Sequence, residues 1–230
     1  DAALNWLPAR QDLTFWPIRS MAVDRMNSNN IYLGTDYDGG WKTTDAGASW
    51  FKASTGLYEG MIIITLDIDP QNTAVLYAGL AGGTAWTIGN IYQSTNGGIS
   101  WQMKDSGIPR ESGSYINAVF SLVIDPDSAS ILYAGMSYKG VYKTTNAGAS
   151  WIAINDSLPK MSPDYYCPVN ALAVDPHHQN RLSALVQGDY YIYENSYWHK
   201  INQTYFPNDP ILWDDIFFHP AIADRVFSSG

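Results

Sequence analysis

The stretch Thr43-Thr44-Asp45-Ala46-Gly47-Ala48-Ser49-Trp50 decides the fold, because it recurs twice more with little change. Residues 94–101 read Ser-Thr-Asn-Gly-Gly-Ile-Ser-Trp, and residues 144–151 read Thr-Thr-Asn-Ala-Gly-Ala-Ser-Trp. A degraded copy at residues 193–198 ends in Trp198, and a truncated copy at residues 1–6 ends in Trp6. A unit that returns about every 50 residues indicates an architecture assembled from repeats.

Two further motifs keep the same period. An apolar segment that ends in Asp-Pro or a close relative is followed, after a polar turn, by a segment such as Leu-Tyr-Ala-Gly. The copies of the first lie at 21–24, 66–70, 122–126, 172–176 and 216–220, and those of the second at 31–34, 76–79, 132–135, 182–184 and 226–229. Such segments are typical of short strands, and no stretch shows a helical period. We therefore expect an all-β fold, a β-propeller of four-stranded antiparallel blades, with about four complete blades and a split fifth.

The repeated turn has a structural explanation. Asp or Asn caps nearby backbone N–H groups, glycine accepts a positive φ, and tryptophan supplies a large apolar face at the start of the fourth strand. This chemistry favours a structural role over a catalytic one. The residues so interpreted are Asp45, Gly47, Trp50, Asn96, Gly98, Trp101, Asn146, Gly148 and Trp151.

The repeats resemble the BNR or Asp-box family of β-propellers over almost the whole chain. That family includes sialidases, sortilin-type receptors, photosystem assembly factors and the xyloglucanase-type glycoside hydrolases of family 74, and the resemblance is nearest to the last of these and to sortilin-like propellers. Because the family is functionally mixed, the motif marks the fold strongly and the function weakly.

The period sets the expected domain organisation. The blades cover approximately residues 7–52, 53–103, 104–153, 154–200, and 201–230 together with 1–6. Either a single five-blade ring closes with one strand lacking, or the chain is an excerpt of a larger propeller. We favour the excerpt, because an unclosed blade leaves unpaired strand edges that natural chains avoid.

The amino-acid composition excludes some classes of binding partner. Lys and Arg total 13 against 22 Asp and Glu, which gives a formal net charge of −9 and argues against nucleic acid and anionic membranes. No apolar run is long enough to span a bilayer, so no membrane insertion is expected, and the single cysteine, Cys167, forms no internal disulfide. His177 and His178 are adjacent but too few for a zinc site, so we expect neither metal nor cofactor.

Loops between second and third strands, and from each fourth strand to the next blade, are expected on one face, opposite the repeated turns. Their aromatic residues stand beside carboxylates, a combination that suits sugar rings and their hydroxyl groups. The alternative is that these aromatics pack the loops against one another. The candidate ligand-binding residues are Tyr37, Trp86, Tyr115, Tyr138, Tyr166 and Trp213.

The resemblance to family 74 also implies a catalytic carboxylate in a Thr-Asp-x-Gly-Gly-like loop. Residues 35–40 are similar to it with one extra residue, so Asp36 or Asp38 is the match, and Asp214 or Asp215 could supply a second acid. Glycosidases need two carboxylates about 5–5.5 Å apart for retention or about 6.5–9.5 Å apart for inversion. The alternative is that Asp36 and Asp38 cap a tight turn.

Other members of the family fit less well. Sialidases need three arginines and an Arg-Ile-Pro signature that is absent here, photosystem assembly factors use a basic patch, and sortilin-type receptors carry a Cys-rich module. We therefore expect a secreted or extracellular carbohydrate-directed propeller, a binding or scaffold module whose partner is a polysaccharide or glycan. The alternatives are part of a family-74-like endo-β-1,4-glucanase or xyloglucanase, and a platform for protein partners.

Overall fold

Every regular element of the described chain is a β-strand. The computed structural model describes residues 16–82, 91–109, 117–178 and 180–201, and the backbone of 215–218 and 226–229. These residues contain no helix, and hence none of the length and hydrophobicity that crossing a bilayer requires. The predicted all-β fold is confirmed.

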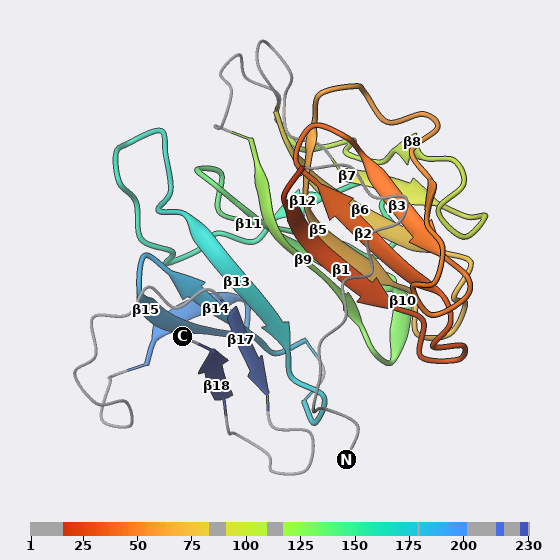
Figure 1. Cartoon of the computed structure of the whole chain (residues 1–230). Helices are drawn as coiled ribbons and strands as arrows, with labels where there is room; N and C mark the ends of the chain where they lie inside the picture. Colours follow the sequence, from red (N-terminus) through yellow and green to blue (C-terminus); the bar gives the residue numbers. More distant parts are fainter. Residues whose placement is uncertain are drawn as a thin grey trace.

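The strands form four antiparallel four-stranded sheets and one two-stranded sheet, each in chain order (Figure 1). Blade 1 holds β1 (Ile18–Val23), β2 (Ile31–Thr35), β3 (Gly40–Thr43) and β4 (Phe51–Lys52). Blade 2 holds β5 (Ile62–Ile68), β6 (Leu76–Ala81), β7 (Ile91–Ser94) and β8 (Gln102–Met103). Blade 3 holds β9 (Val119–Asp125), β10 (Ser128–Met136), β11 (Val141–Thr144) and β12 (Ile152–Ala153). Blade 4 holds β13 (Val169–Val174), β14 (Leu182–Val186), β15 (Asp189–Glu194) and β16 (Tyr197–Lys200), and β17 (Asp215–Phe218) pairs with β18 (Val226–Ser229).

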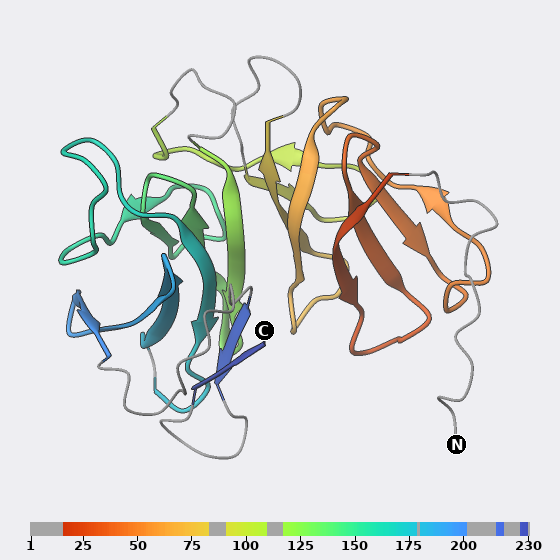
Figure 2. The same cartoon turned by 60° about the vertical axis from the view of Figure 1, so that its left-hand side comes forward.

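The blades are arranged side by side around a common centre. Figures 1 and 2 show the first strand of each sheet on the inside, with β5 next to β1, β9 next to β5 and β13 next to β9. β17 continues this order, because it lies beside β13 and β14. This is the blade arrangement of a β-propeller, with four complete blades and the first two strands of a fifth. That the chain belongs to a larger propeller stays a prediction.

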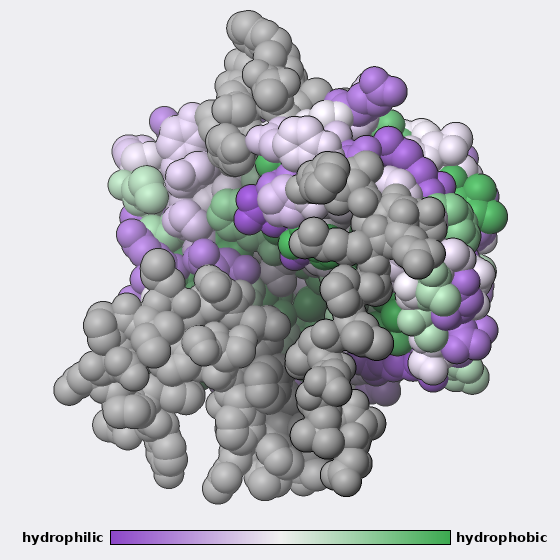
Figure 3. Space-filling view, viewed as in Figure 1, coloured by the Kyte–Doolittle hydropathy of each residue, from purple (hydrophilic) through white to green (hydrophobic). Residues whose placement is uncertain are grey.

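The core consists of clusters between successive blades, because side chains alternate between the two faces of each strand. Between blades 1 and 2, Tyr32 packs with Ile63, Leu76 and Trp101, among others. Analogous clusters join Tyr77 to blade 3 and Tyr133 to blade 4. Apolar side chains occupy the recess at the centre of the molecule, green in Figure 3. Each sheet therefore depends on its neighbour for burial of its apolar face.

The outer face of blade 1 is different. Met21 of β1 pairs with Leu33, and the corresponding residues Leu122 and Leu172 pair with Ala134 and Ala184. Leu122 and Leu172 are each 3% exposed, whereas Met21 is 63% exposed, because a preceding blade covers only the later positions. This face of blade 1 has the apolar character of a blade interface.

The same hydrogen bonds recur inside the repeated turns, which explains why the three turns have the same residue pattern. The Asp45 carboxylate accepts from the Thr43 hydroxyl at 2.6 Å and from the Ser49 N–H at 2.8 Å. Asn96 and Asn146 make the same contacts with their own neighbours. Gly47, Gly98 and Gly148 have φ of 93°, 80° and 82°.

The tryptophans of these turns connect blades. The indole N–H of Trp101 donates to the carbonyl of Ala53 in the preceding connection, and Trp151 and Trp198 donate likewise to Lys104 and Ile154. The expectation that the fourth strand opens at the tryptophan was off by one residue in blades 1 to 3. In blades 2 and 3 the backbone N–H of the tryptophan donates to the preceding connection, Trp101 to Thr55 and Trp151 to Ser106; in blade 4, where the turn is shorter, β16 begins one residue before Trp198.

Candidate functional site

Those loops singled out from the sequence that the structure describes share one face of the molecule, here called the loop face. In blades 1 and 3, backbone hydrogen bonds join the loop between the second and third strands to a segment that enters an inner strand: Asp36 N–H donates to Pro17, Ser137 N–H to Ala118, and Tyr166 N–H to Tyr138. The repeated turns and the turns between first and second strands lie at the other ends of the strands, on what we call the turn face.

Asp36 and Asp38 are both held by cations. The Asp36 carboxylate is almost fully buried and accepts two hydrogen bonds from the Arg19 guanidinium, at 2.7 and 2.8 Å. Asp38 accepts from the Trp41 indole N–H and from the Lys52 ammonium, each at 3.0 Å. A bidentate guanidinium contact fixes the orientation of a carboxylate. Both side chains are therefore oriented acceptors at the end of blade 1.

An aromatic pair stands beside these carboxylates. Tyr37 takes a left-handed backbone conformation (φ 62°), and its side chain packs on an apolar cluster that contains Ile62 and Ala118. The Trp16 indole meets the Tyr37 ring edge-on, with centroids 5.2 Å apart and planes at 67°, and Trp16 is 49% exposed. An exposed indole supported by a second ring is a rigid apolar surface open to solvent. We call Trp16, Arg19, Asp36, Tyr37 and Asp38 the blade-1 site.

Sequence reasoning identified Asp36, Tyr37 and Asp38 but missed Trp16 and Arg19. Neither belongs to a repeated motif, and both precede or lie within the first strand of blade 1. The sequence signal that could have found Trp16 was its position with Pro17 just before the first strand of blade 1. The segment that enters an inner strand belongs to the loop face, so an aromatic residue there is a candidate.

A second aromatic group joins the loops of blades 3 and 4. Tyr138 meets Tyr165 edge-on at 6.2 Å between centroids, and the Lys139 ammonium lies 5.2 Å from the centre of the Tyr165 ring. The Lys160 ammonium stands 5.0 Å from the centre of the Tyr166 ring, which also packs against the cluster between blades 3 and 4. Tyr138 and Tyr165 pack the two loops against each other, in the manner of the packing alternative.

Four other candidates, Trp86, Tyr115, Trp213 and Asp214, lie outside the described residues. The remaining chemical candidates have structural surroundings. Cys167 is buried, and burial raises the pKa of its thiol, which disfavours the thiolate that a nucleophile needs. In the described ranges no group of three or more His, Cys, Asp or Glu side chains could hold a metal ion.

A cavity of about 510 Å³ opens on the turn face where the inner strands of blades 1, 2 and 3 end. It contains Asp67, whose pKa is raised to about 6, chiefly by burial. The Asp67 carboxylate accepts the backbone N–H of Ile68 at 2.9 Å and that of Ile124 at 3.0 Å. Both contacts are structural, and Asp24 and Asp69 in the same wall cap the backbone of their own turns.

Comparison with known proteins places the fold. No protein-family model matches the chain, and no curated protein matches it by sequence. An ancestral GH74 enzyme matches with a TM-score of 0.61 and 27% identity, over 80% of this chain and 25% of its own. The GH74 enzyme of Niastella koreensis matches with a TM-score of 0.71 and 23% identity, over 91% of this chain and 35% of its own. YCF48 bound to D1 peptide matches with a TM-score of 0.57 and 15% identity, over 89% of this chain and 58% of its own.

The chain is thus a β-propeller that resembles those of GH74 enzymes. It spans only 25% and 35% of the length of the two GH74 structures.

Proposed function

We propose that this chain is part of an extracellular, carbohydrate-directed β-propeller that binds a polysaccharide at the blade-1 site. The observation that carries the proposal is the half-exposed Trp16 indole, braced by Tyr37 and placed next to Asp36 and Asp38. The likeness to an ancestral GH74 enzyme at 27% identity supports the same class of ligand.

The chemistry of the site fits a neutral sugar. The C–H face of a pyranose ring is apolar and packs on an aromatic surface, while its hydroxyl groups donate to carboxylates. Arg19 and Lys52 hold Asp36 and Asp38 in fixed orientations, so little freedom is lost when a ligand binds. Because the two cations also balance the two carboxylates, the site does not select strongly for a charged ligand.

The proposal is tested by binding of the purified chain to xyloglucan, a mixed-linkage β-glucan and, as an unrelated polymer, an α-glucan. Affinity electrophoresis should show retardation in one of the β-glucan gels. Absence of retardation in every gel, together with stable capture of one protein partner from the native host, would favour the protein-platform alternative.

A second function, part of a GH74-like hydrolase, is favoured by the position of Asp36 and Asp38 after a second strand and by the GH74 neighbours. The Arg19 guanidinium engages both oxygens of Asp36, whereas the Lys52 ammonium engages one oxygen of Asp38, which makes Asp38 the stronger candidate. Reducing-sugar release from xyloglucan should then fall sharply in Asp38→Asn and less in Asp36→Asn. Wild-type protein that releases no sugar while binding the polymer supports the binding module alone.

A further inference from the structure

The repeated turns of blades 2 and 3 fill the interface with the preceding blade. Between blades 1 and 2 the Lys42 ammonium donates to the Gly97 carbonyl at 3.0 Å, above the Tyr32 ring. Tyr32 also packs closely on Gly98, where an added Cβ would lie 3.1 Å from its ring. Between blades 2 and 3 the Tyr77 hydroxyl donates to the Ala147 carbonyl at 3.3 Å. In both places a backbone carbonyl of the turn receives the donor from the preceding blade.

Blade 4 lacks this filling element. Thr144 and Tyr193 occupy equivalent places, each paired with the corresponding leucine of its second strand, yet Tyr193 is two residues closer to its tryptophan. Only Asn195 and Ser196, with φ of 52° and 71°, close the turn between β15 and β16. A tight two-residue hairpin of this kind does not project toward blade 3.

A cavity of about 630 Å³ occupies the place where the turn is shortened. Its wall comes from β11, from the turn before β14 and from the short hairpin, and consists of Lys143, His178, Asn180, Arg181, Tyr193, Glu194, Asn195 and Ser196. This volume is typical of small-molecule sites.

Lys143 in the cavity wall and the neighbouring Tyr133 lack the turn carbonyl that accepts from their counterparts. Lys143 is the equivalent of Lys42 and lies over the Tyr133 ring, but its ammonium donates to the side-chain oxygen of Asn180 at 2.8 Å and has no carboxylate partner in the described chain. Tyr133, the equivalent of Tyr77, is fully buried, and its hydroxyl makes no hydrogen bond to any described residue. A buried hydroxyl without a partner is costly.

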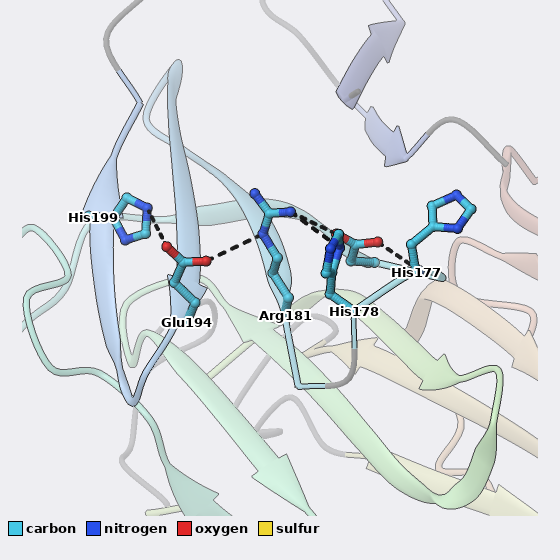
Figure 4. A network of polar contacts seen from close by, with 6 residues as sticks. His177, His178, Arg181, Glu194 and His199 are labelled. Atoms are coloured by element: carbon cyan, nitrogen blue, oxygen red, sulfur yellow. Dashed lines mark hydrogen bonds and ion pairs between the residues drawn. The ribbon is translucent and has the colours of Figure 1, made fainter. Parts of the chain in front are cut away.

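The other charged side chains of the wall are already in contact with groups of opposite charge. Figure 4 shows Arg181 between two acidic groups: it contacts Glu194 at 3.6 Å and the buried carboxylate of Asp175 at 3.1 Å. His178 also contacts Asp175, and His199 contacts Glu194 at 3.5 Å. Among the charged side chains that line the cavity, the Lys143 ammonium is therefore the one that forms no ion pair with a described residue; Asp125 acts on it only at longer range.

We propose that this cavity binds a hydroxylated carboxylate of sugar size, such as a uronic acid. Its carboxylate takes the place of the missing turn carbonyl at Lys143, its hydroxyl groups meet Glu194 and the hairpin, and its ring lies against Tyr193. The site is on the turn face, opposite Trp16, and is independent of the proposed function.

Isothermal titration with glucuronate, and with glucose as its neutral counterpart, tests the proposal. Wild-type protein should bind glucuronate and not glucose, and Lys143→Gln should bind glucuronate about tenfold more weakly or worse. Gln93 holds the equivalent position in blade 2, so this substitution is compatible with the fold. The matched control is Lys42→Gln, whose interface is filled, and it should keep wild-type affinity.

A second variant makes the test independent of Lys143. Replacing residues 193–197 by the seven residues of 144–150 restores the long turn, should fill the cavity and should abolish glucuronate binding. The proposal is overturned if wild-type protein does not prefer glucuronate to glucose, if Lys143→Gln binds as wild type does, or if both lysine variants weaken equally. Trp16→Ala should leave glucuronate affinity unchanged, which separates this result from that of the proposed function.

Discussion

The carboxylate of Asp67 in blade 2 accepts a hydrogen bond from the backbone N–H of Ile124 in blade 3, at 3.0 Å. Corresponding positions in the inner strands of the other complete blades carry Ala22, Val123 and Ala173. A carboxylate thus stands where the other complete blades carry an apolar side chain, and its desolvation raises the pKa of Asp67 to about 6.

This carboxylate makes stability depend on pH. The pKa of Asp67 is higher in the folded protein than the ordinary value of 3.8, so the folded state holds the proton longer. Stability should therefore fall as pH rises from about 4 to about 6, and then level off. Asp67→Asn keeps an acceptor for Ile124 without the charge, and should exceed wild type by about 1 to 2 kcal/mol at pH 7.5 and by nothing at pH 4.

Urea denaturation at pH 4, 6 and 7.5 measures this difference. Asp69→Asn is the control, because Asp69 caps its own turn and should not gain stability from loss of its charge. An Asp67→Asn variant that is less stable than wild type at pH 7.5 would show that the ionised carboxylate strengthens the seam.

Asp45 should have the opposite pH dependence. Hydrogen bonds from Ser49 and Thr43 lower the pKa of Asp45 to about 2. Its contribution is therefore complete above about pH 4 and is lost as pH falls from about 4 to about 2. Asp45→Asn reproduces the residue of the sibling turns and should flatten this acid dependence, whereas Asp45→Ala should also lose stability at pH 7. Thermal unfolding from pH 2 to 7 distinguishes them, and identical acid profiles for wild type and Asp45→Asn would contradict this assignment.

The connection after blade 2 passes close to Trp151, so substitution of Gly107 in that connection should cost much stability. A Cβ on Gly107 would overlap the carbonyl oxygen of Trp151, and φ there is 93°. Gly60 has a φ of 75° but open space around it. Gly60→Ala should cost about 1 kcal/mol, and Gly107→Ala should cost about 3 kcal/mol or more, because backbone must move. Chemical denaturation of both measures the contrast, and equal costs would mean that conformation alone, not the clash, matters.

Much of the fold was predictable because the blade repeats. The spacing of Trp50, Trp101 and Trp151 and the alternating strands between them specify the blades, and the Asp-box-like turns have their hydrogen-bonding logic in sequence. The offset of the fourth strand was not predictable from the repeat, because it differs between blades: β4, β8 and β12 begin one residue after the tryptophan, and β16 begins one residue before it.

The sites were less accessible to sequence reasoning. Asp36 and Tyr37 could be placed on the loop face, but their partners Arg19 and Trp16 reach them only through folding of a non-repeated segment. The cavity near Lys143 exists because the turn of blade 4 is two residues shorter than the others. The effect of this shortening is visible only by comparison with Lys42 and Tyr77, which donate to backbone carbonyls of the longer turns. Asp67 was identified only once the strand register showed its apolar equivalents.

The most direct test of the carbohydrate assignment is calorimetric titration of wild type, Trp16→Ala and Tyr197→Ala with xyloglucan oligosaccharides. Tyr197 is the control, because it is a comparably exposed aromatic residue, 46% against 49%, on the turn face. Trp16→Ala should weaken binding about tenfold, through loss of the stacking surface, while Tyr197→Ala binds as wild type does. Equal binding by wild type and Trp16→Ala, or no binding by wild type, would contradict the blade-1 site.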